Sequence, residues 1–213
     1  QHSNFPLQYG YACVGEVVKT GQGVDPALLG RQVFSFQPHA SHFLARSDEL
    51  IPIPDDISLL DAVFLPNMET AVNLVHDGRP LLGERVAVVG QGIVGLLSTA
   101  VLSRIHLAEL VAVDTRPERL VLASKLGAAA GLSPDEASRR QDGRASAAMD
   151  LVFELSGQPE ALNLAIGLCG FASRIVIGSW YGNKSTPVEL GGEAHRNRLQ
   201  ILTSQVSTLA PEY

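Results

Sequence analysis

Three glycines at fixed spacing follow a short apolar run in the 213-residue chain. They are Gly90, Gly92 and Gly95, in the pattern G-x-G-x-x-G directly after residues 86–89. The first glycine permits a tight strand-to-helix turn, the second lets the backbone approach a pyrophosphate, and the third lets the helix pack closely on the strand. The phosphates would lie at the helix N-terminus, against unpaired N–H groups and the positive end of the helix dipole. The motif therefore predicts a dinucleotide site.

An acidic residue follows the next apolar run. Asp114 ends residues 110–114, about 20 residues beyond the glycines, as a contact to the adenosine ribose requires. A carboxylate there accepts hydrogen bonds from the ribose hydroxyls and repels a 2′-phosphate, which favours NAD(H) over NADP(H). Arg116 and Arg119 oppose this preference, because a nearby arginine could recruit that phosphate. The alternative interpretation is that the glycines serve only a turn and Asp114 only a solvated loop.

A parallel sheet would bring these residues together, and the chain after Gly83 has the required alternation of strands and helices. The expected strands are residues 85–89, 110–113, 127–131, 151–154, 174–177 and 200–204, and the expected helices are residues 93–105, 117–126 and 159–168. A polar stretch, residues 133–146, separates the third strand from the fourth. This alternation predicts an α/β fold with a doubly wound parallel sheet of the Rossmann type, covered by helices on both faces.

The sequence before this region has a different pattern, with short apolar runs separated by turns. Short strand candidates are residues 15–21, 30–36, 42–45 and 50–53. Prolines and aspartates at residues 52–56 mark a break, and the spacing turns helical from Leu59 up to a turn at residues 77–80. We therefore expect a small β domain over residues 1–72 and the Rossmann domain over residues 73–213.

Further stretches of the chain resemble the medium-chain dehydrogenase/reductase superfamily, which contains the zinc-type alcohol dehydrogenases and their zinc-free relatives. They are residues 10–17, 80–86, 150–157 and 175–178. The resemblance covers nearly the whole chain. It implies that residues 1–72 are part of a GroES-like catalytic domain, and that the chain is the middle of a longer protein. Fingerprint and resemblance together give these cofactor-binding residues: Thr70, Gly90, Gly92, Ile93, Val94, Gly95, Asp114, Arg119, Ser156, Gly157 and Gly178.

The chain departs from the superfamily at its metal ligands. Members with a catalytic zinc carry Gly-His-Glu where this chain has Gly10-Tyr11-Ala12, and a neutral phenol is a poor zinc donor. A further ligand position falls at about Pro66, which cannot coordinate a metal. The closely spaced cysteines of the structural-zinc lobe are also missing. Because a catalytic zinc needs about three protein ligands, we predict no metal.

Hydride transfer without zinc needs side chains that handle a proton or polarise a carbonyl. Tyr11 stands at the replaced ligand position, so it is one candidate for catalysis, and His42 is the other. The alternatives are a packing role for the tyrosine and an ordinary loop position for the histidine. Trp180 and Tyr181 could flank the nicotinamide or form a substrate wall, or they could be a surface pair.

We therefore expect a zinc-independent NAD(H)-dependent oxidoreductase that acts on a small carbonyl, alcohol or activated alkene. The alternatives are an NADPH-dependent quinone or enoyl reductase and a non-catalytic dinucleotide-binding module.

Composition limits the remaining possibilities. The net charge of −6 and the absence of a lysine/arginine run argue against nucleic-acid and anionic-membrane partners. The longest apolar stretch, residues 86–102, is interrupted by polar residues and is shorter than the roughly 20 residues of a membrane span. Cys13 and Cys169 are expected to be buried thiols of a cytoplasmic protein. By resemblance, residues 200–206 would join two copies edge to edge in a homodimer.

Overall fold

The computed structural model describes residues 8–140 and 147–206, and the chain divides into two compact units. The first unit is Gln1–Pro66 and the second is Asn67–Tyr213. The division falls near the start of helix α2 (Leu65–Gly78). The domain boundary expected from the sequence, between residues 72 and 73, lies within the same helix.

The first unit is built on a small antiparallel sheet in the order β1-β2-β3, formed by β1 (Cys13–Glu16), β2 (Gln32–Ser35) and β3 (Ile51–Pro52). Helix α1 (Leu59–Ala62) follows it. The strand expected at residues 42–45 is wrong. Those residues are exposed and lead into a short 3-10 helix, Ser47–Glu49, where the Glu49 carboxylate accepts a hydrogen bond from the Arg46 N–H at 3.2 Å and the chain turns.

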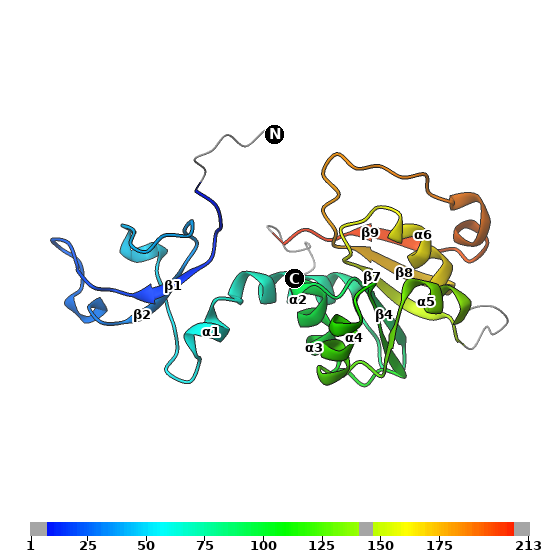
Figure 1. Cartoon of the computed structure of the whole chain (residues 1–213), viewed down its shortest axis with the longest axis horizontal. Coiled ribbons are helices and arrows are strands. Elements are labelled where there is room, and N and C mark those ends of the chain that lie inside the picture. Colours follow the sequence, from blue (N-terminus) through cyan, green and yellow to red (C-terminus); the bar gives the residue numbers. More distant parts are fainter. Residues whose placement is uncertain (1–7, 141–146, 207–213) are drawn as a thin grey trace. The chain divides into compact units, whose positions relative to one another are not determined.

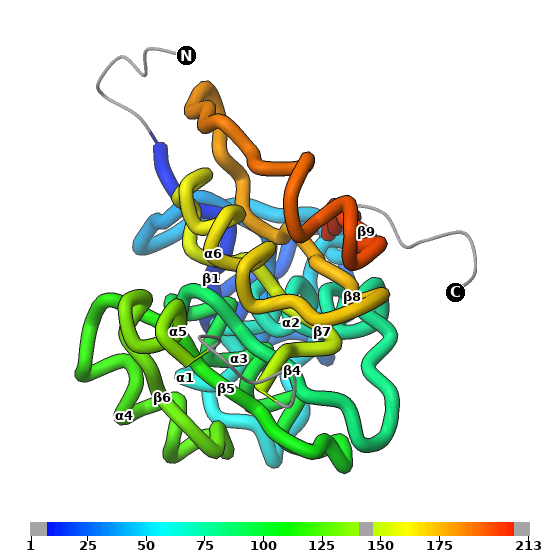
Figure 2. The backbone as a smooth tube through the Cα atoms, turned by 90° about the vertical axis from the view of Figure 1, so that its right-hand side faces the viewer, coloured from blue at the N-terminus to red at the C-terminus, as the bar shows by residue number. Residues whose placement is uncertain are grey.

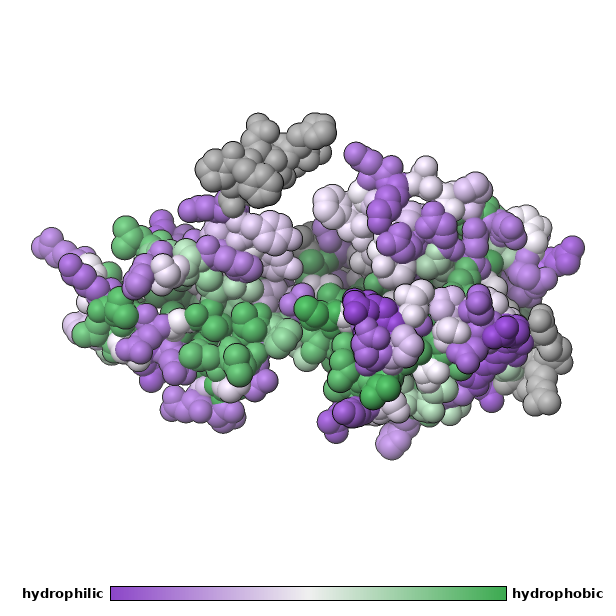
Figure 3. Space-filling model, in the orientation of Figure 1, coloured by the Kyte–Doolittle hydropathy of each residue, from purple (hydrophilic) through white to green (hydrophobic). Residues whose placement is uncertain are grey.

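The described part of the first unit has little core. Its buried hydrophobic side chains are Val33 and Phe34. Large hydrophobic side chains remain exposed in this unit, and Figure 3 shows hydrophobic residues, in green, on the face turned to the viewer. They are Tyr9, Tyr11, Val18, Leu29, Phe36, Phe43, Leu44, Ile51, Ile57, Leu60, Phe64 and Leu65.

The second unit contains a six-stranded sheet whose neighbouring strands all pair in parallel. Its strands are β4 (Arg85–Val89), β5 (Glu109–Val113), β6 (Ala130–Leu132), β7 (Met149–Glu154), β8 (Cys169–Ile177) and β9 (Gln200–Thr203). The order is β6-β5-β4-β7-β8-β9, which can be followed in Figure 2 from β6 low in the view to β9 high in it. This doubly wound order confirms the predicted α/β Rossmann fold.

Helices cover both faces of this sheet (Figure 1). The helices α2, α3 (Ile93–Leu102) and α4 (Pro117–Lys125) lie on one face, and α5 (Pro134–Arg140) and α6 (Ala161–Leu168) lie on the other. In β4, Val86 and Val88 pack toward α2 and α3, whereas Ala87 and Val89 pack toward α6. Both faces of the strand are thus buried, which explains its continuous apolar sequence.

Helix α5 is an element that the sequence analysis did not identify inside the polar stretch 133–146. Its start carries a capping box: the Ser133 hydroxyl accepts from the N–H of Glu136 at 3.3 Å, and the Glu136 carboxylate accepts from the N–H of Ser133 at 2.8 Å. Pro134 occupies the first helical position. Residues 141–146 of the stretch lie outside the described residues. None of the helices that the structure describes has the length and hydrophobicity of a membrane span.

Candidate dinucleotide-binding site

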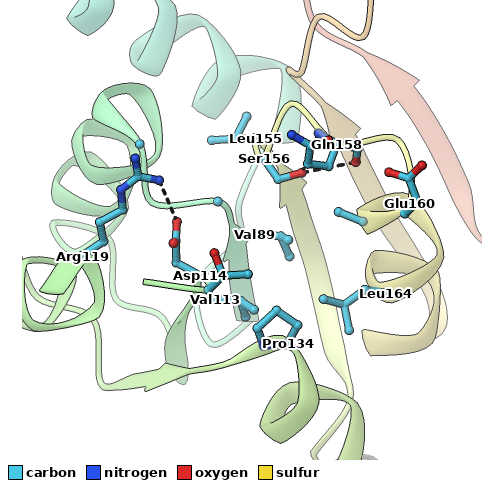
Figure 4. A pocket seen from close by; sticks show the side chains of 14 residues that line it. Val89, Val113, Asp114, Arg119, Pro134, Leu155, Ser156, Gln158, Glu160 and Leu164 are labelled. Carbon is cyan, nitrogen blue, oxygen red and sulfur yellow. Dashed lines mark hydrogen bonds and ion pairs between the residues drawn. The ribbon is translucent and has the colours of Figure 1, made fainter. Parts of the chain in front are cut away.

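A pocket of about 640 Å³ lies at the carboxyl ends of β4, β5 and β7 (Figure 4). The connection from β4 crosses one face of the sheet through α3, whereas the connection from β7 crosses the other face through α6. The strand order therefore reverses beside β4 and leaves a crevice. Such a crevice is where open α/β sheets bind their ligands.

The glycine loop forms one wall of the pocket, to which Gly90 and Gly92 contribute. Gly90 has a φ of +94°, and a Cβ on it would lie 2.6 Å from the backbone N of Ser156. A Cβ on Gly95 would lie only 1.9 Å from the carbonyl oxygen of Gly90. Both positions therefore require glycine, because the loop lies against backbone on either side.

Helix α3 points its N-terminus into this loop. Gly92 is the N-cap residue and supplies no side-chain cap, and the first intrahelical hydrogen bond runs from Leu96 N–H to the Gly92 carbonyl at 2.9 Å. The N–H groups of the first turn, including those of Ile93 and Val94, thus have no partner within the helix. Together with the positive end of the helix dipole they form a site for a pyrophosphate. The glycine cradle and the open N–H groups fit a dinucleotide.

Gln91 holds the glycine loop from inside the protein. Its side chain is fully buried, donates to the Val88 carbonyl at 3.0 Å and accepts from the Thr99 hydroxyl at 3.1 Å. Its backbone N–H donates to the Asp114 carboxylate at 2.6 Å. This single residue ties the loop to β4, to α3 and to the acidic residue after β5.

Asp114 lines the pocket and is nearly buried, with 7% of its surface exposed. One carboxylate oxygen accepts from the Gln91 N–H, and the other accepts from the Arg116 N–H at 2.9 Å. These two backbone donors fix the carboxylate at the pocket edge. A carboxylate has about four acceptor positions, so capacity remains for ribose hydroxyls.

The charges around the pocket are mostly negative. Arg119 lines it and lies 3.4 Å from Asp114, whereas Arg116 pairs with Glu118 at 2.6 Å outside it. Glu160 also lines the pocket, from the start of α6. One arginine thus stands among two carboxylates. Its contact with Asp114 is long, and 38% of the Arg119 side chain is exposed.

Ser156 and Gly157 lie in the loop between β7 and α6. Ser156 lines the pocket, and its hydroxyl donates to Glu154 while accepting from the Gln158 N–H at 3.1 Å. Gly157 has a φ of +70° and donates its N–H to the Ser179 hydroxyl at 2.8 Å. Gly178 follows β8, where a Cβ would lie 2.5 Å from a Leu74 methyl group, so close packing explains that glycine.

Some of the expected cofactor residues line the pocket and others do not. Those that line it are Gly90, Gly92, Asp114, Arg119 and Ser156. The others lie on α2, on the first turn of α3 or just beyond β7 and β8; they are Thr70, Ile93, Val94, Gly95, Gly157 and Gly178. Their contact with a cofactor stays a prediction.

The residues predicted to act in catalysis both belong to the first unit. Tyr11 is 60% exposed, and His42 is exposed in a bend. Trp180 is 92% exposed, whereas Tyr181 is half-buried and donates a hydrogen bond to Glu154. The catalytic roles of Tyr11 and His42 stay predictions.

Metal ligands do not cluster in residues 8–140 and 147–206. Within these ranges no group of three or more His, Cys, Asp or Glu side chains is placed to hold a metal ion. The described residues by themselves therefore do not supply the three protein ligands of a catalytic zinc.

Sequence reasoning missed the apolar wall of the pocket. Val89 and Val113 come from strand ends, Pro134 from the start of α5, and Ala161 and Leu164 from α6. An apolar wall beside a few fixed polar groups suits the flat face of a nucleobase. The signal for Pro134 was available, since Ser133-Pro134 opens a helix with a capping box.

The site and the fold define a Rossmann dinucleotide-binding unit, and comparison with known proteins identifies the family. Residues 94–213, more than half of the chain, match the family described as zinc-binding dehydrogenase. The chain therefore belongs to the zinc-binding dehydrogenase family, which confirms the superfamily resemblance seen in the sequence.

Two curated relatives and one solved structure illustrate the match. The chain is 26% identical to (R,R)-butanediol dehydrogenase of Bacillus subtilis, over 92% of this chain and 63% of that protein. It is 29% identical to L-threonine 3-dehydrogenase of Streptomyces coelicolor, over 81% of this chain and 60% of that protein. The structure of galactitol-1-phosphate dehydrogenase from Escherichia coli is similar with a TM-score of 0.79 and 19% identity, over 98% of this chain and 70% of that one. The chain thus spans about three fifths of the length of the curated relatives.

Proposed function

We propose that this chain is the dinucleotide-binding part of an NAD(H)-dependent oxidoreductase that transfers a hydride to or from a small alcohol, carbonyl compound or activated alkene without zinc. The observation that carries the proposal is the pocket that combines the glycine loop with a fixed carboxylate, Asp114. Membership of a dehydrogenase family supports oxidoreductase chemistry. Tyr11 and Pro66, which stand where the resemblance places metal ligands, support zinc independence.

The chain's own residues would divide the work of binding. The N–H groups at the start of α3 hold the pyrophosphate, Asp114 accepts hydrogen bonds from the adenosine ribose, and the apolar wall with Leu164 packs against the base. The nicotinamide, when bound, accepts or donates the hydride. Tyr11 and His42 are our candidates for handling the proton, and as a whole protein the enzyme is expected to be a homodimer joined along β9.

The preference for NAD(H) follows from charge. Asp114 lies where an NADP 2′-phosphate would sit, and the carboxylate is fixed by two backbone N–H groups, so it cannot swing away from the phosphate. Arg119 favours the opposite preference, but its 3.4 Å contact already engages it with Asp114. We therefore expect tighter binding of NADH than of NADPH.

Parallel titrations of NADH and NADPH, followed by the fluorescence of the reduced dinucleotide, test this proposal. The wild-type protein should bind NADH saturably and NADPH at least tenfold more weakly. In the variant Asp114→Asn, NADH should bind about tenfold more weakly, because a hydrogen bond to a charged group is lost, and the NADH/NADPH ratio should fall. The matched control is Asp56→Asn, an exposed aspartate of the first unit, which should leave both affinities unchanged.

The possible outcomes separate the alternatives. Equal affinities for the two dinucleotides in the wild type would refute the role of Asp114 and favour the NADPH-dependent reductase. Binding of NADH without hydride exchange on a panel of alcohols and carbonyl compounds would favour a non-catalytic binding module. Absence of binding to either dinucleotide would refute the oxidoreductase proposal itself.

A further inference from the structure

Glu154 is a buried carboxylate for which the proposed function has no direct use. It ends β7 and none of its surface is exposed. Moving a carboxylate out of water is costly, and a buried charge is weak evidence for stability, since an apolar residue would fill the same space. The residues that Glu154 holds in place by hydrogen bonds are therefore the better explanation for a carboxylate at this position.

The donors that hold Glu154 come from two separate segments. One carboxylate oxygen accepts from both the backbone N–H and the hydroxyl of Ser156, in the loop between β7 and α6. The other accepts from the hydroxyl of Tyr181, in the segment that follows β8. Burial and the Glu154 carboxylate raise the pKa of Tyr181, so its hydroxyl stays protonated and remains a donor.

The same two segments are joined by further hydrogen bonds. The Ser179 hydroxyl accepts from the Gly157 N–H at 2.8 Å and donates to the Glu154 carbonyl at 3.3 Å. The Lys184 ammonium donates to the Gly157 carbonyl at 2.8 Å. Residues 179–184, which we call the strap, are thus joined to the loop 155–158 directly at Ser179 and Lys184, and through the Glu154 side chain at Tyr181. Of these contacts only that of Tyr181 reaches the buried carboxylate.

The fastened loop is part of the pocket. Leu155, Ser156 and Gln158 line it, and Figure 4 shows Ser156 and Gln158 on its rim. In a doubly wound sheet a dinucleotide extends from the half that contains β4 and β5 to the half that contains β7 and β8. Asp114 marks the adenosine half, so the loop and the strap lie at strand ends along the path toward the other half.

We propose that Glu154 is a positioning residue that, through Tyr181, locks the strap onto the loop 155–158 and thereby holds one wall of the dinucleotide pocket in its binding geometry. This inference rests on the proposed function, because the wall matters only if the pocket binds a dinucleotide. In this proposal, Glu154 positions the strap and the loop through its hydrogen bonds and not through its charge.

The strap contains an intrinsic fluorophore that reports on its mobility. Trp180 is the only tryptophan and is 92% exposed, between the fastened residues Ser179 and Tyr181. Its fluorescence anisotropy measures how tightly the strap is held, with or without a ligand. The state of the strap can therefore be read independently of dinucleotide binding.

Three variants test the proposal. Tyr181→Phe removes only the donor oxygen, and Glu154→Met removes the acceptor while keeping the volume. Glu154→Gln keeps an acceptor for Ser156 and offers Tyr181 an amide donor, so it should restore the lock without the charge. Tyr9→Phe, an exposed tyrosine of the first unit, is the matched control. For each variant, NADH affinity by calorimetry, Trp180 anisotropy and the thermal midpoint are measured, the first two well below the midpoint.

The proposal expects Tyr181→Phe and Glu154→Met to lower NADH affinity about tenfold and to lower Trp180 anisotropy, whereas Glu154→Gln and Tyr9→Phe stay within threefold of wild type. A lower midpoint with unchanged affinity and anisotropy would mean a merely structural role and would overturn it. If Glu154→Met does not fold, Tyr181→Phe decides alone. Failure of the wild type to bind NADH would instead refute the proposed function, and it is seen before any variant is made.

Discussion

Gly95 should be the least replaceable residue of the glycine loop. A Cβ on it would lie 1.9 Å from the Gly90 carbonyl oxygen, and real Cβ contacts are essentially never shorter than 3.0 Å, so Gly95→Ala forces a movement of at least 1.1 Å. The obstructing atom belongs to the backbone and cannot rotate aside. Overpacking of this kind costs about 1–3 kcal/mol. The better helix propensity of alanine returns about 1 kcal/mol, so the clash dominates.

The assay compares this variant with Gly92→Ala. A Cβ on Gly92 meets no atom within 4 Å, but Gly92 lines the pocket, so a methyl group there would face the ligand. Gly95→Ala should therefore lower both the free energy of unfolding, by up to about 2 kcal/mol in urea titrations, and NADH affinity, by at least tenfold. Gly92→Ala should lower NADH affinity alone. Wild-type stability and affinity in Gly95→Ala would show that α3 does not pack on the loop as described.

Further predictions concern two side chains away from the pocket. Arg174→Met should lower the free energy of unfolding by about 2 kcal/mol in urea titrations, because it removes the ion-pair partner, 2.8 Å away, of the mostly buried Glu84 carboxylate. Arg46→Met, which breaks an exposed pair, should have no measurable effect, and equal effects of the two variants would contradict this reasoning. Burial raises the pKa of the Cys169 thiol from 9.0 to about 12, so native protein at pH 8 should be alkylated at Cys13 alone, as read by mass spectrometry. The Cys169 thiol ionises at a lower pH in the unfolded chain than in the folded protein. The free energy of unfolding should therefore fall as the pH rises above 9.0, and it should not show this fall in a Cys169→Ala variant.

The parts of the fold that the sequence predicted are those governed by local patterns. The apolar run of β4 and the glycines after it depend on burial on both faces and on the absence of side chains, and both are visible in a few consecutive residues. Asp114 was predictable because the length of α3 and β5 fixes its spacing from the loop. The parallel pairing of the strands followed from their alternation with helices, whereas their order did not.

The errors have physical causes of two kinds. Helix α5 was overlooked because its polar surface hid a valid capping box at Ser133 and Glu136. The early start of β8 at Cys169 was missed for a different reason. Its first residues pair with β7 through an irregular register beside Met149, and Ala172 has a φ of +58°, which no local pattern indicates.

Gln91 and Glu154 show where the limit of sequence reasoning lies within the site. Both are fully buried polar residues at the ends of strands beside the pocket, and each fastens a loop that lines it. A glycine motif is recognisable because its function depends on what the residue lacks. The function of Gln91 and Glu154 depends instead on partners that are distant in sequence, namely Thr99, Asp114 and Tyr181. A polar residue directly after an apolar strand of a parallel sheet is therefore a candidate for such a fastening role, and its partners become visible only once the strand order is known.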